Sequence, residues 1–482
     1  MIISPHPIVL YDPDTWSAQS DCDCACPSAP PVPHPPLDRP LRLRSHPLLR
    51  HIPLNTEYSV AFVPSFSRVA VLNRAARTML ALPVELNNDQ RDDQRDGMIT
   101  LCYRLGLLTE NDGALPLPPR PDTLSAWLHV TNACNLRCTY CYVAKSDEAM
   151  TEEIGLAAID AVFRSALAND YRAVWLKYAG GEASLNLALV DRMQRHALGL
   201  GTRLGIAVHG KVLSNGTVLT TRRLQHIRDL GLGLMVSLDG MEAIHDQQRP
   251  TIAGRGSFRL ALASLERALA LGLCPDVSIT VTGASVAGLP ELLRWILPRD
   301  LPFSINFVRP LERGVSRQEL QLDERRIIDG MRAAFAVIAE NLPHRSLLGA
   351  LLDRAHFGAA HERTCAAGQN YLVIDHQGRI ATCQMELAHP VADLSTPDPL
   401  ALIRADRSGV QNLPVDQKEG CRTCEWRYWC AGGCAVATYR ATGRYDVRSP
   451  NCGIYTALYG DVLRLEGLRL LQQSTGRIRR EE

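Results

Sequence analysis

Cys134-Asn135-Leu136-Arg137-Cys138-Thr139-Tyr140-Cys141 is the most informative stretch of the sequence. It follows the largely apolar run 126–131, which predicts a strand, so the three cysteines are expected on a loop at the carboxyl end of that strand. Three thiolates this close together can bind a metal ion or a cluster, but they leave one position unfilled. Structural zinc takes four protein ligands, and an iron–sulfur cluster held by three cysteines leaves one iron for an outside ligand.

The composition narrows the class of protein. A chain of 482 residues with 46% hydrophobic and 21% charged residues is typical of a soluble protein of several domains. A formal net charge of +1 favours neither nucleic acid nor an anionic membrane as a partner. The sequence has no apolar run of membrane-spanning length and no signal peptide, so we expect a cytoplasmic protein. The 15 cysteines then indicate metal or cluster ligation rather than disulfides.

Residues 124 to about 310 alternate strand and helix patterns, which is typical of a parallel sheet wrapped by helices. Strands are predicted over 125–131, 173–178, 206–213, 232–238, 276–283 and 302–308. Such α/β folds bind their ligands beyond the carboxyl ends of the strands. We therefore expect the functional residues in the loops that follow these six strands.

The C-x3-C-x2-C spacing, with Tyr140 before the last cysteine, resembles the signature of the radical S-adenosylmethionine (SAM) superfamily. The resemblance implies an α/β fold with a partial (β/α)6 barrel. It also implies a [4Fe-4S] cluster held by Cys134, Cys138 and Cys141, whose open iron chelates SAM. An electron from a donor such as flavodoxin or ferredoxin would cleave SAM to a 5′-deoxyadenosyl radical, which abstracts hydrogen from the substrate.

The same resemblance implies a set of residues that contact SAM: Tyr140, Gly180, Gly181, Glu182, Ser214, Asn215, Ser237 and Arg249. The two glycines would let the backbone approach the amino group of SAM, and Glu182 would pair with that ammonium. Arg249 would grip the SAM carboxylate through two hydrogen bonds. From the residues alone, the glycine pair could equally be a tight turn and Arg249 an ordinary ion-pair residue.

A second group of cysteines lies near the C-terminus: Cys365, Cys383, Cys421, Cys424, Cys430, Cys434 and Cys452. Their order and spacing resemble the SPASM domain, which holds two auxiliary [4Fe-4S] clusters. The resemblance assigns Cys421, Cys424, Cys430 and Cys452 to an outer cluster, and Cys365, Cys383 and Cys434 to an inner one, for three clusters in all. Residues 366–382 contain no cysteine, so the inner cluster keeps an open iron or takes another ligand. Spacing alone leaves a pair of zinc sites as an alternative.

The N-terminal region divides in two. Residues 1–53 are rich in proline and are predicted to be irregular; no role is assigned to Cys22, Cys24 and Cys26 within them. Residues 54–115 predict strands at 58–63 and 68–72 and helices at 74–82, capped by Asn73, and 98–108. This pattern is similar to the winged-helix domain that recognises precursors in peptide-maturation systems. A leader peptide would add to its edge strand; the alternative is a structural cap. A barrel (116–310), a helical bridge (311–360) and a SPASM domain with a C-terminal helix (361–482) would follow.

These patterns together predict a radical SAM/SPASM maturase. It would install a thioether or carbon–carbon cross-link in a ribosomally made peptide or protein, with no nucleic-acid or membrane partner. Peptide epimerisation, oxidative decarboxylation and a zinc-bearing peptide-binding scaffold without turnover remain alternatives. Gln384 stands where the sulfatase-maturating branch has an aspartate base, which argues against formylglycine formation. No residue is assigned as the general base.

Overall fold

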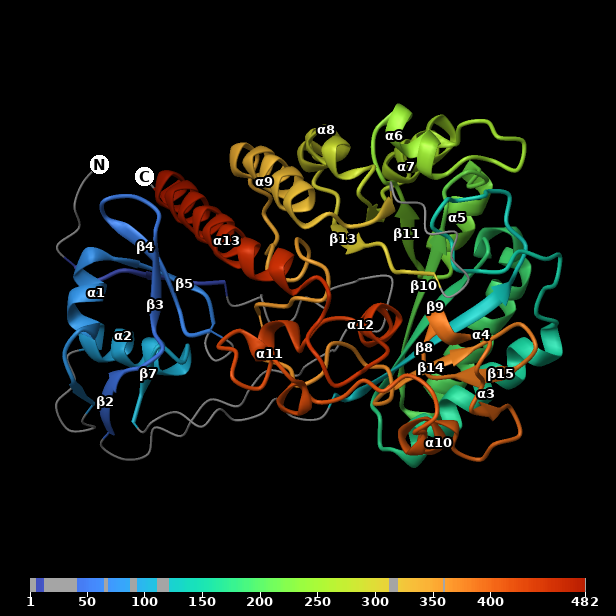
Figure 1. Ribbon diagram of the computed structural model, residues 1–482, viewed down its shortest axis with the longest axis horizontal. Helices are drawn as coiled ribbons and strands as arrows, with labels where there is room; N and C mark the ends of the chain where they lie inside the picture. The colour runs from blue at the N-terminus through green and yellow to red at the C-terminus, as the bar shows by residue number, and fades with distance from the viewer. Residues whose placement is uncertain are drawn as a thin grey trace.

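The computed structural model describes residues 6–12, 41–64, 68–86, 93–110, 121–311, 320–358 and 360–481. Cys22, Cys24 and Cys26 lie outside these ranges, as does most of the proline-rich segment at 115–121. An N-terminal domain, a cysteine-rich region and a barrel follow one another along the longest axis of the molecule (Figure 1). No helix in the described ranges has the length and hydropathy of a membrane-spanning segment.

Six parallel strands form the barrel and neighbour one another in chain order. They are β8 (Thr123–Thr131), β9 (Ala173–Gly180), β10 (Ala207–Ser214), β11 (Gly233–Ser237), β12 (Asp276–Val281) and β13 (Phe303–Phe307). The helices that cover them are α3 (Glu152–Ala168), α4 (Leu187–Leu204), α5 (Thr221–Asp229), α6 (Glu242–Gln248), α7 (Phe258–Ala270) and α8 (Leu289–Ile296). The α/β class and all six predicted strands are confirmed, with ends shifted by a few residues.

Local sequence signals explain where these helices begin and end. The hydroxyl of Thr151 accepts a hydrogen bond from the backbone N–H of Ile154 at 3.3 Å and so caps α3. Helix α4 ends at Gly205, whose φ of 69° is in the left-handed region that glycine tolerates. Gly155 lets α3 approach α4, because a Cβ there would lie 2.9 Å from Leu189 Cδ1.

The cysteine-rich region extends the barrel sheet. Strand β14 (Tyr371–Ile374) pairs in parallel with β8, and β15 (Arg379–Ala381) and β16 (Ala392–Asp393) add antiparallel strands to give nine in all. Helix α10 (Pro399–Ala405) packs on α3, where Asp398 accepts a 2.7 Å hydrogen bond from Ser165. The remaining helices are α9 (Glu324–Glu340), α11 (Arg427–Cys430), α12 (Ala435–Thr442) and α13 (Cys452–Glu481).

The N-terminal domain contains more strands than its sequence predicts. One sheet has the order β1-β5-β4-β3, built from β1 (Val9–Leu10), β3 (Arg50–Pro53), β4 (Tyr58–Phe62) and β5 (Ala70–Asn73). A second has the order β6-β2-β7, built from β2 (Leu41–Ser45), β6 (Val84–Leu86) and β7 (Leu108–Thr109). Two helices, α1 (Arg74–Leu80) and α2 (Asp93–Arg104), complete the described portion of the domain.

Three expectations for this domain can be compared with these elements. Asn73 caps α1 as predicted, since its Oδ1 accepts from the N–H of Ala76 at 2.9 Å. An irregular structure is wrong for 41–45 and 50–53: leucine alternates with arginine along β2, and this period-two pattern buries Leu41 and Leu43. The second helix begins and ends earlier than expected. Its end is early because Gly106 takes a φ of 77° and the chain continues into β7.

Helix α13 joins the cysteine-rich region to the N-terminal domain (Figure 1). It begins at Cys452 and packs on β3, β4 and β5. Gly467 makes this contact close, because an added Cβ would overlap Val60 Cγ2 and lie 3.1 Å from Leu54 Cδ1. Arg469, which is 1% exposed, forms ion pairs with Glu466 and with Asp12. The N-terminal domain therefore docks through a buried, specific interface.

Candidate functional site

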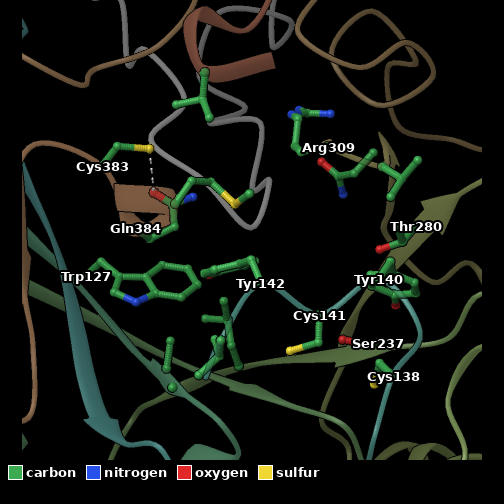
Figure 2. Close-up of a pocket in the computed structure, with 18 of the residues that line it drawn as sticks. Trp127, Cys138, Tyr140, Cys141, Tyr142, Ser237, Thr280, Arg309, Cys383 and Gln384 are labelled. Atoms are coloured by element: carbon green, nitrogen blue, oxygen red, sulfur yellow. Dashed lines mark hydrogen bonds between the residues drawn. The ribbon is translucent and has the colours of Figure 1, made fainter. Parts of the chain in front are cut away.

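A cavity of about 250 Å³ lies at the carboxyl ends of the barrel strands. Cys134, Cys138 and Cys141 line it, and so do three cysteines from the C-terminal region: Cys365, Cys383 and Cys434. Figure 2 shows Cys138 and Cys141 on the barrel side of this space, with Cys383 across it and Trp127 and Tyr142 between them. Every residue that the sequence predicted to contact SAM also lines the cavity.

The glycine pair at the end of β9 has a neighbour that the sequence did not predict. A Cβ on Gly180, whose φ is 145°, would overlap the carbonyl oxygen of Thr131, and a Cβ on Gly181 would overlap that of Ala133. The N–H groups of Gly181 and Glu182 donate to these same two oxygens at 2.7 and 2.9 Å. These glycines therefore let the cysteine loop lie directly against β9, in addition to lining the cavity.

The cysteine loop is held from two further directions. Asn215 donates from Nδ2 to Asn135 Oδ1 at 2.9 Å, and Asn135 donates to the hydroxyl of Thr217 at 2.7 Å. On the opposite side, the N–H of Arg137 donates to Pro250 O at 2.7 Å and the N–H of Thr139 donates to Gln248 O at 2.9 Å. The loop is thus fixed between the ends of β9 and β10 and the segment that carries Arg249.

The thiols of this loop are suited to bind a metal cofactor, which would take the place of their protons. The N–H of Leu136 lies 3.4 Å from Cys134 Sγ and Asn215 Nδ2 lies 3.9 Å from it, and both groups would stabilise a thiolate. Burial raises the pKa of Cys138 to about 11. A buried thiol with so high a pKa stays protonated at neutral pH unless a metal takes the place of the proton.

Arg249 belongs to a buried network at the ends of β11 and β12. Its Nη1 donates to the phenolic oxygen of Tyr140 at 2.5 Å and lies 3.5 Å from Asp239 Oδ2, which also accepts from Tyr140 at 2.6 Å. The other carboxylate oxygen of Asp239 accepts from the N–H of Thr280 at 2.9 Å. Arg249 Nε is buried without a hydrogen-bond partner. Sequence reasoning missed Asp239, although it follows Ser237-Leu238 at the end of a strand.

Glu182, Ser214 and Ser237 lie where the sequence predicted. Glu182 is 2% exposed and accepts from the hydroxyl of Ser214 at 2.7 Å, from the N–H of Asn215 at 2.6 Å and from the N–H of Ser184 at 3.0 Å. These donors lie around the ends of β9 and β10, so the carboxylate ties the two strands together. Ser237 faces the cavity beside Cys141 (Figure 2).

The three C-terminal cysteines of the cavity have cationic neighbours that sequence reasoning missed. Arg309 and Arg354 line the same space, and Arg309 Nη2 donates to Asp353 at 2.8 Å. Burial raises the pKa of Cys434, but the two guanidinium groups outweigh it and leave that pKa below its ordinary value. Neither arginine lies in a recognisable motif, so no local sequence signal marks them.

The other four C-terminal cysteines do not line the cavity. Cys424, Cys430 and Cys452 are electrostatic neighbours of Cys421, and burial raises the pKa of Cys421 to about 12. Trp426 and Trp429 lie in the same segment and pack against Phe62 of β4 in tilted arrangements, with ring centroids 5.9 Å away in each case. In the described portion of the chain, no three His, Cys, Asp or Glu side chains converge on a point that could hold a single metal ion.

Comparison with known proteins shows which families and structures this chain resembles. Residues 128–296 match the family model of the radical SAM superfamily. The chain is 26% identical over 357 residues to the serine-type anaerobic sulfatase-maturating enzyme of Klebsiella aerogenes, an alignment that covers 69% of this chain and 83% of the relative. The structure of anSMEcpe with bound AdoMet covers 73% of this chain and 98% of its own, with a TM-score of 0.59 and 15% identity. A structure of the same protein with AdoMet and the Cp18Cys peptide gives a TM-score of 0.58 at 16% identity, covering 73% and 99% of the two chains.

The structural likeness shows a shared fold, and the family match covers the end of β8, the cysteine loop and strands β9 to β12. The resemblance predicted from the sequence is thereby confirmed at the level of the superfamily. Members of this superfamily use SAM and a [4Fe-4S] cluster. Residues 128–296 therefore form a radical SAM domain, and the relatives that this chain resembles are maturating enzymes.

Proposed function

We propose that this enzyme is a SPASM-type maturase that installs a thioether or carbon–carbon cross-link in a ribosomally made peptide or protein segment. One observation carries the proposal: a single cavity lies between the cysteine loop of the barrel and three cysteines of the C-terminal region. A substrate side chain in that cavity would reach two redox centres at once. Forming a cross-link removes hydrogen from the substrate, so the reaction needs a place for the surplus electron.

Ten cysteines would supply the ligands of three iron–sulfur clusters. Cys134, Cys138 and Cys141 would hold the cluster that binds SAM, and Cys365, Cys383 and Cys434 would hold the inner auxiliary cluster. The outer auxiliary cluster would take the four cysteines Cys421, Cys424, Cys430 and Cys452. When bound, SAM and its cluster supply the radical that removes hydrogen from a substrate carbon.

The protein's own residues would orient SAM and exclude water. The unpartnered Nε of Arg249 is a donor for the SAM carboxylate, while Asp239 and Tyr140 fix the direction of the guanidinium. Apolar side chains line much of the cavity: Trp127, Val143, Leu213, Met235, Phe307, Val308 and Met385. Such a lining keeps water from a reactive carbon centre and strengthens the electrostatic interactions inside.

The charge of the cavity favours a thiol as one partner in the cross-link. Lys145, Arg249, Arg309 and Arg354 line it, and Glu182 is the one described carboxylate that does so. Nearby guanidinium groups lower the pKa of a thiol and so raise the fraction of thiolate, which is the nucleophile and the metal ligand. The inner site also has only three cysteines, which leaves a position for a substrate sulfur.

A leader peptide would bind to the N-terminal domain. Strands β3 and β1 form the edges of its four-stranded sheet, and a peptide could pair with such an edge through main-chain hydrogen bonds. The peptide complex of anSMEcpe supports a peptide or protein substrate for this fold. Formylglycine formation is less suitable, because the amide Gln384, rather than a carboxylate base, lines the cavity, and its Oε1 accepts from the hydroxyl of Tyr371 at 3.2 Å.

Anaerobic reconstitution with iron and sulfide tests this function. The wild type should bind iron for three clusters, form 5′-deoxyadenosine from SAM, and convert a short peptide encoded beside its gene into a product that has lost a pair of hydrogen atoms. Cys421→Ala should keep SAM cleavage but lose the cross-linked product. Cross-linking at the wild-type yield by that variant would remove the outer cluster from the mechanism. A product of unchanged mass but altered chirality would instead identify an epimerase.

A further inference from the structure

Lys418 is a buried cation that the proposed function does not use. It is 1% exposed, and its ammonium donates to the carbonyl oxygen of Ala431 at 2.7 Å. An ammonium with this little exposure has lost most of its hydration, which costs several kcal/mol unless anionic groups surround it. Sequence reasoning gave Lys418 no role, because a lysine three residues before a cysteine belongs to no recognisable motif.

The carbonyl oxygen of Ala431 is the point where the two C-terminal cysteine groups meet. Ala431 directly follows Cys430, an outer cysteine. The hydroxyl of Thr364, which directly precedes the inner cysteine Cys365, also donates to Ala431 O at 3.0 Å and to Gly433 O at 2.6 Å. Lys418 and Thr364 therefore hold one turn that connects an outer ligand with an inner one.

That turn has an unusual backbone. Ala431, Gly432 and Gly433 have φ angles of 45°, 76° and 74°, so three consecutive residues are in the left-handed region. Alanine rarely adopts this conformation, because its Cβ crowds the backbone there. Gly432 also permits a close approach of the lysine, since a Cβ there would lie 2.6 Å from Lys418 Cδ and 3.3 Å from Cys421 Sγ. The left-handed backbone at Ala431 thus turns the Ala431 carbonyl oxygen toward Lys418.

Burial lowers the pKa of the Lys418 ammonium, and four nearby cysteines act against that lowering: Cys421, Cys365, Cys430 and Cys434. Two of them belong to the outer group and two to the inner group. Thiolates that ligate a cluster are negatively charged, and the net charge and hydrogen bonds around an iron–sulfur cluster set its reduction potential. A single buried cation between two such groups acts on both.

We propose that Lys418 is a positioning residue shared by both auxiliary clusters: its charge offsets the thiolates of the two sites together and raises both reduction potentials. The inference rests on the proposed function, since it requires that both sites bind iron–sulfur clusters. A centre that is easier to reduce is a better acceptor for the electron left on the substrate after hydrogen abstraction. The shared cation would also couple the two sites. An electron added to one cluster would offset part of the lysine's positive charge and so lower the reduction potential of the other cluster.

Anaerobic redox titration followed by electron paramagnetic resonance tests the proposal. Iron and sulfide content of the wild type is measured first, and a wild type without auxiliary clusters would refute the proposed function rather than the role of Lys418. Lys418→Met removes the charge at nearly constant length and should shift both auxiliary potentials to more negative values, leaving the SAM-binding cluster unchanged. Lys418→Arg keeps the charge and should restore both potentials toward those of the wild type.

Lys145→Met is the matched control, because Lys145 lies beside Cys134 on the barrel side of the cavity. It should shift the SAM-binding cluster and leave the auxiliary potentials as they are. Loss of both auxiliary clusters in Lys418→Met, with retention in Lys418→Arg, would also support a shared charge. Unchanged potentials in Lys418→Met, a shift confined to one auxiliary site, or equal loss of iron in the Met and Arg variants would overturn the proposal.

Discussion

Gly467→Ala adds one methyl group at the closest contact between α13 and the N-terminal domain. The new Cβ would overlap Val60 Cγ2 and lie 3.1 Å from Leu54 Cδ1. Val60 is completely buried within β4, and its β-branched side chain has few alternative rotamers. Forcing an extra methyl into such a packed contact costs about 1–3 kcal/mol. The docked state of the domain should lose that free energy relative to the undocked state.

Gly460→Ala provides the matched control in the same helix. Gly460 is exposed, and an added Cβ would meet no atom within 4 Å. The two variants therefore share a gain in helix propensity of about 1 kcal/mol and differ in the contact. Hydrogen exchange of the β3 and β4 amides, which lie under α13, measures the difference. Relative to Gly460→Ala, Gly467→Ala should raise the exchange rate by about 5- to 150-fold, the equivalent of 1–3 kcal/mol, whereas Gly460→Ala should not raise it above the wild-type rate.

Equal protection of β3 and β4 in the two variants would refute the packing argument. It would mean that Val60 and Leu54 move aside at no cost, or that α13 does not remain docked in solution. If a leader peptide binds to the N-terminal domain, Gly467→Ala should also lower the yield of modified peptide without lowering SAM cleavage on its own. A parallel loss of SAM cleavage would indicate a wider loss of structure.

Three further tests address the cysteine loop, the Arg249 network and a buried histidine of β8. Gly181→Ala should displace the cysteine loop and reduce iron binding and 5′-deoxyadenosine formation, whereas Gly199→Ala, where a Cβ meets nothing within 4 Å, should keep the wild-type iron content. Asp239→Asn removes the carboxylate that pairs with a buried guanidinium and should destabilise the protein to urea by about 3–5 kcal/mol; a loss smaller than about 1 kcal/mol would contradict the network. Burial lowers the pKa of His129 from 6.5 to about 4, so the unfolded chain binds a proton at a higher pH than the folded one. Stability to urea should therefore fall as pH drops from 6.5 to 4, by on the order of 3 kcal/mol from this group, and His129→Gln should flatten that slope.

Sequence patterns predicted the features of the fold that depend on local periodicity. The six barrel strands and their helices follow from alternating apolar runs, and Asn73 capped α1 as its position suggested. The same reasoning failed for β2, because the proline content of the surrounding residues predicted an irregular segment although leucine and arginine alternate along the strand. It also could not predict that β14 pairs with β8, because this pairing joins residues about 250 positions apart through backbone hydrogen bonds that carry no side-chain signature.

Site residues were predictable where they lie in a motif and not where they converge from separate segments. Six of the ten predicted ligand cysteines, and Arg249, line one cavity. Arg309 and Lys418 are single charged residues in otherwise ordinary runs, and only the folded chain brings them beside thiols. The glycine pair was predicted to be part of the site, but its contact with the cysteine loop was not. That contact, between Gly180 and Thr131, depends on how two separate loops pack in the folded chain.

The pairing of β14 with β8 unites the catalytic barrel and the cysteine-rich region in a single continuous sheet. The cysteine-rich region of this chain therefore cannot be exchanged for that of a related enzyme by cutting the chain at residue 360. A chimera cut there would have to rebuild a strand interface in the same register, and a slip of one residue would turn the side chains of β14 to the opposite face. The transplantable unit therefore includes β8, and the cysteine-rich region of this chain cannot be exchanged without part of the barrel.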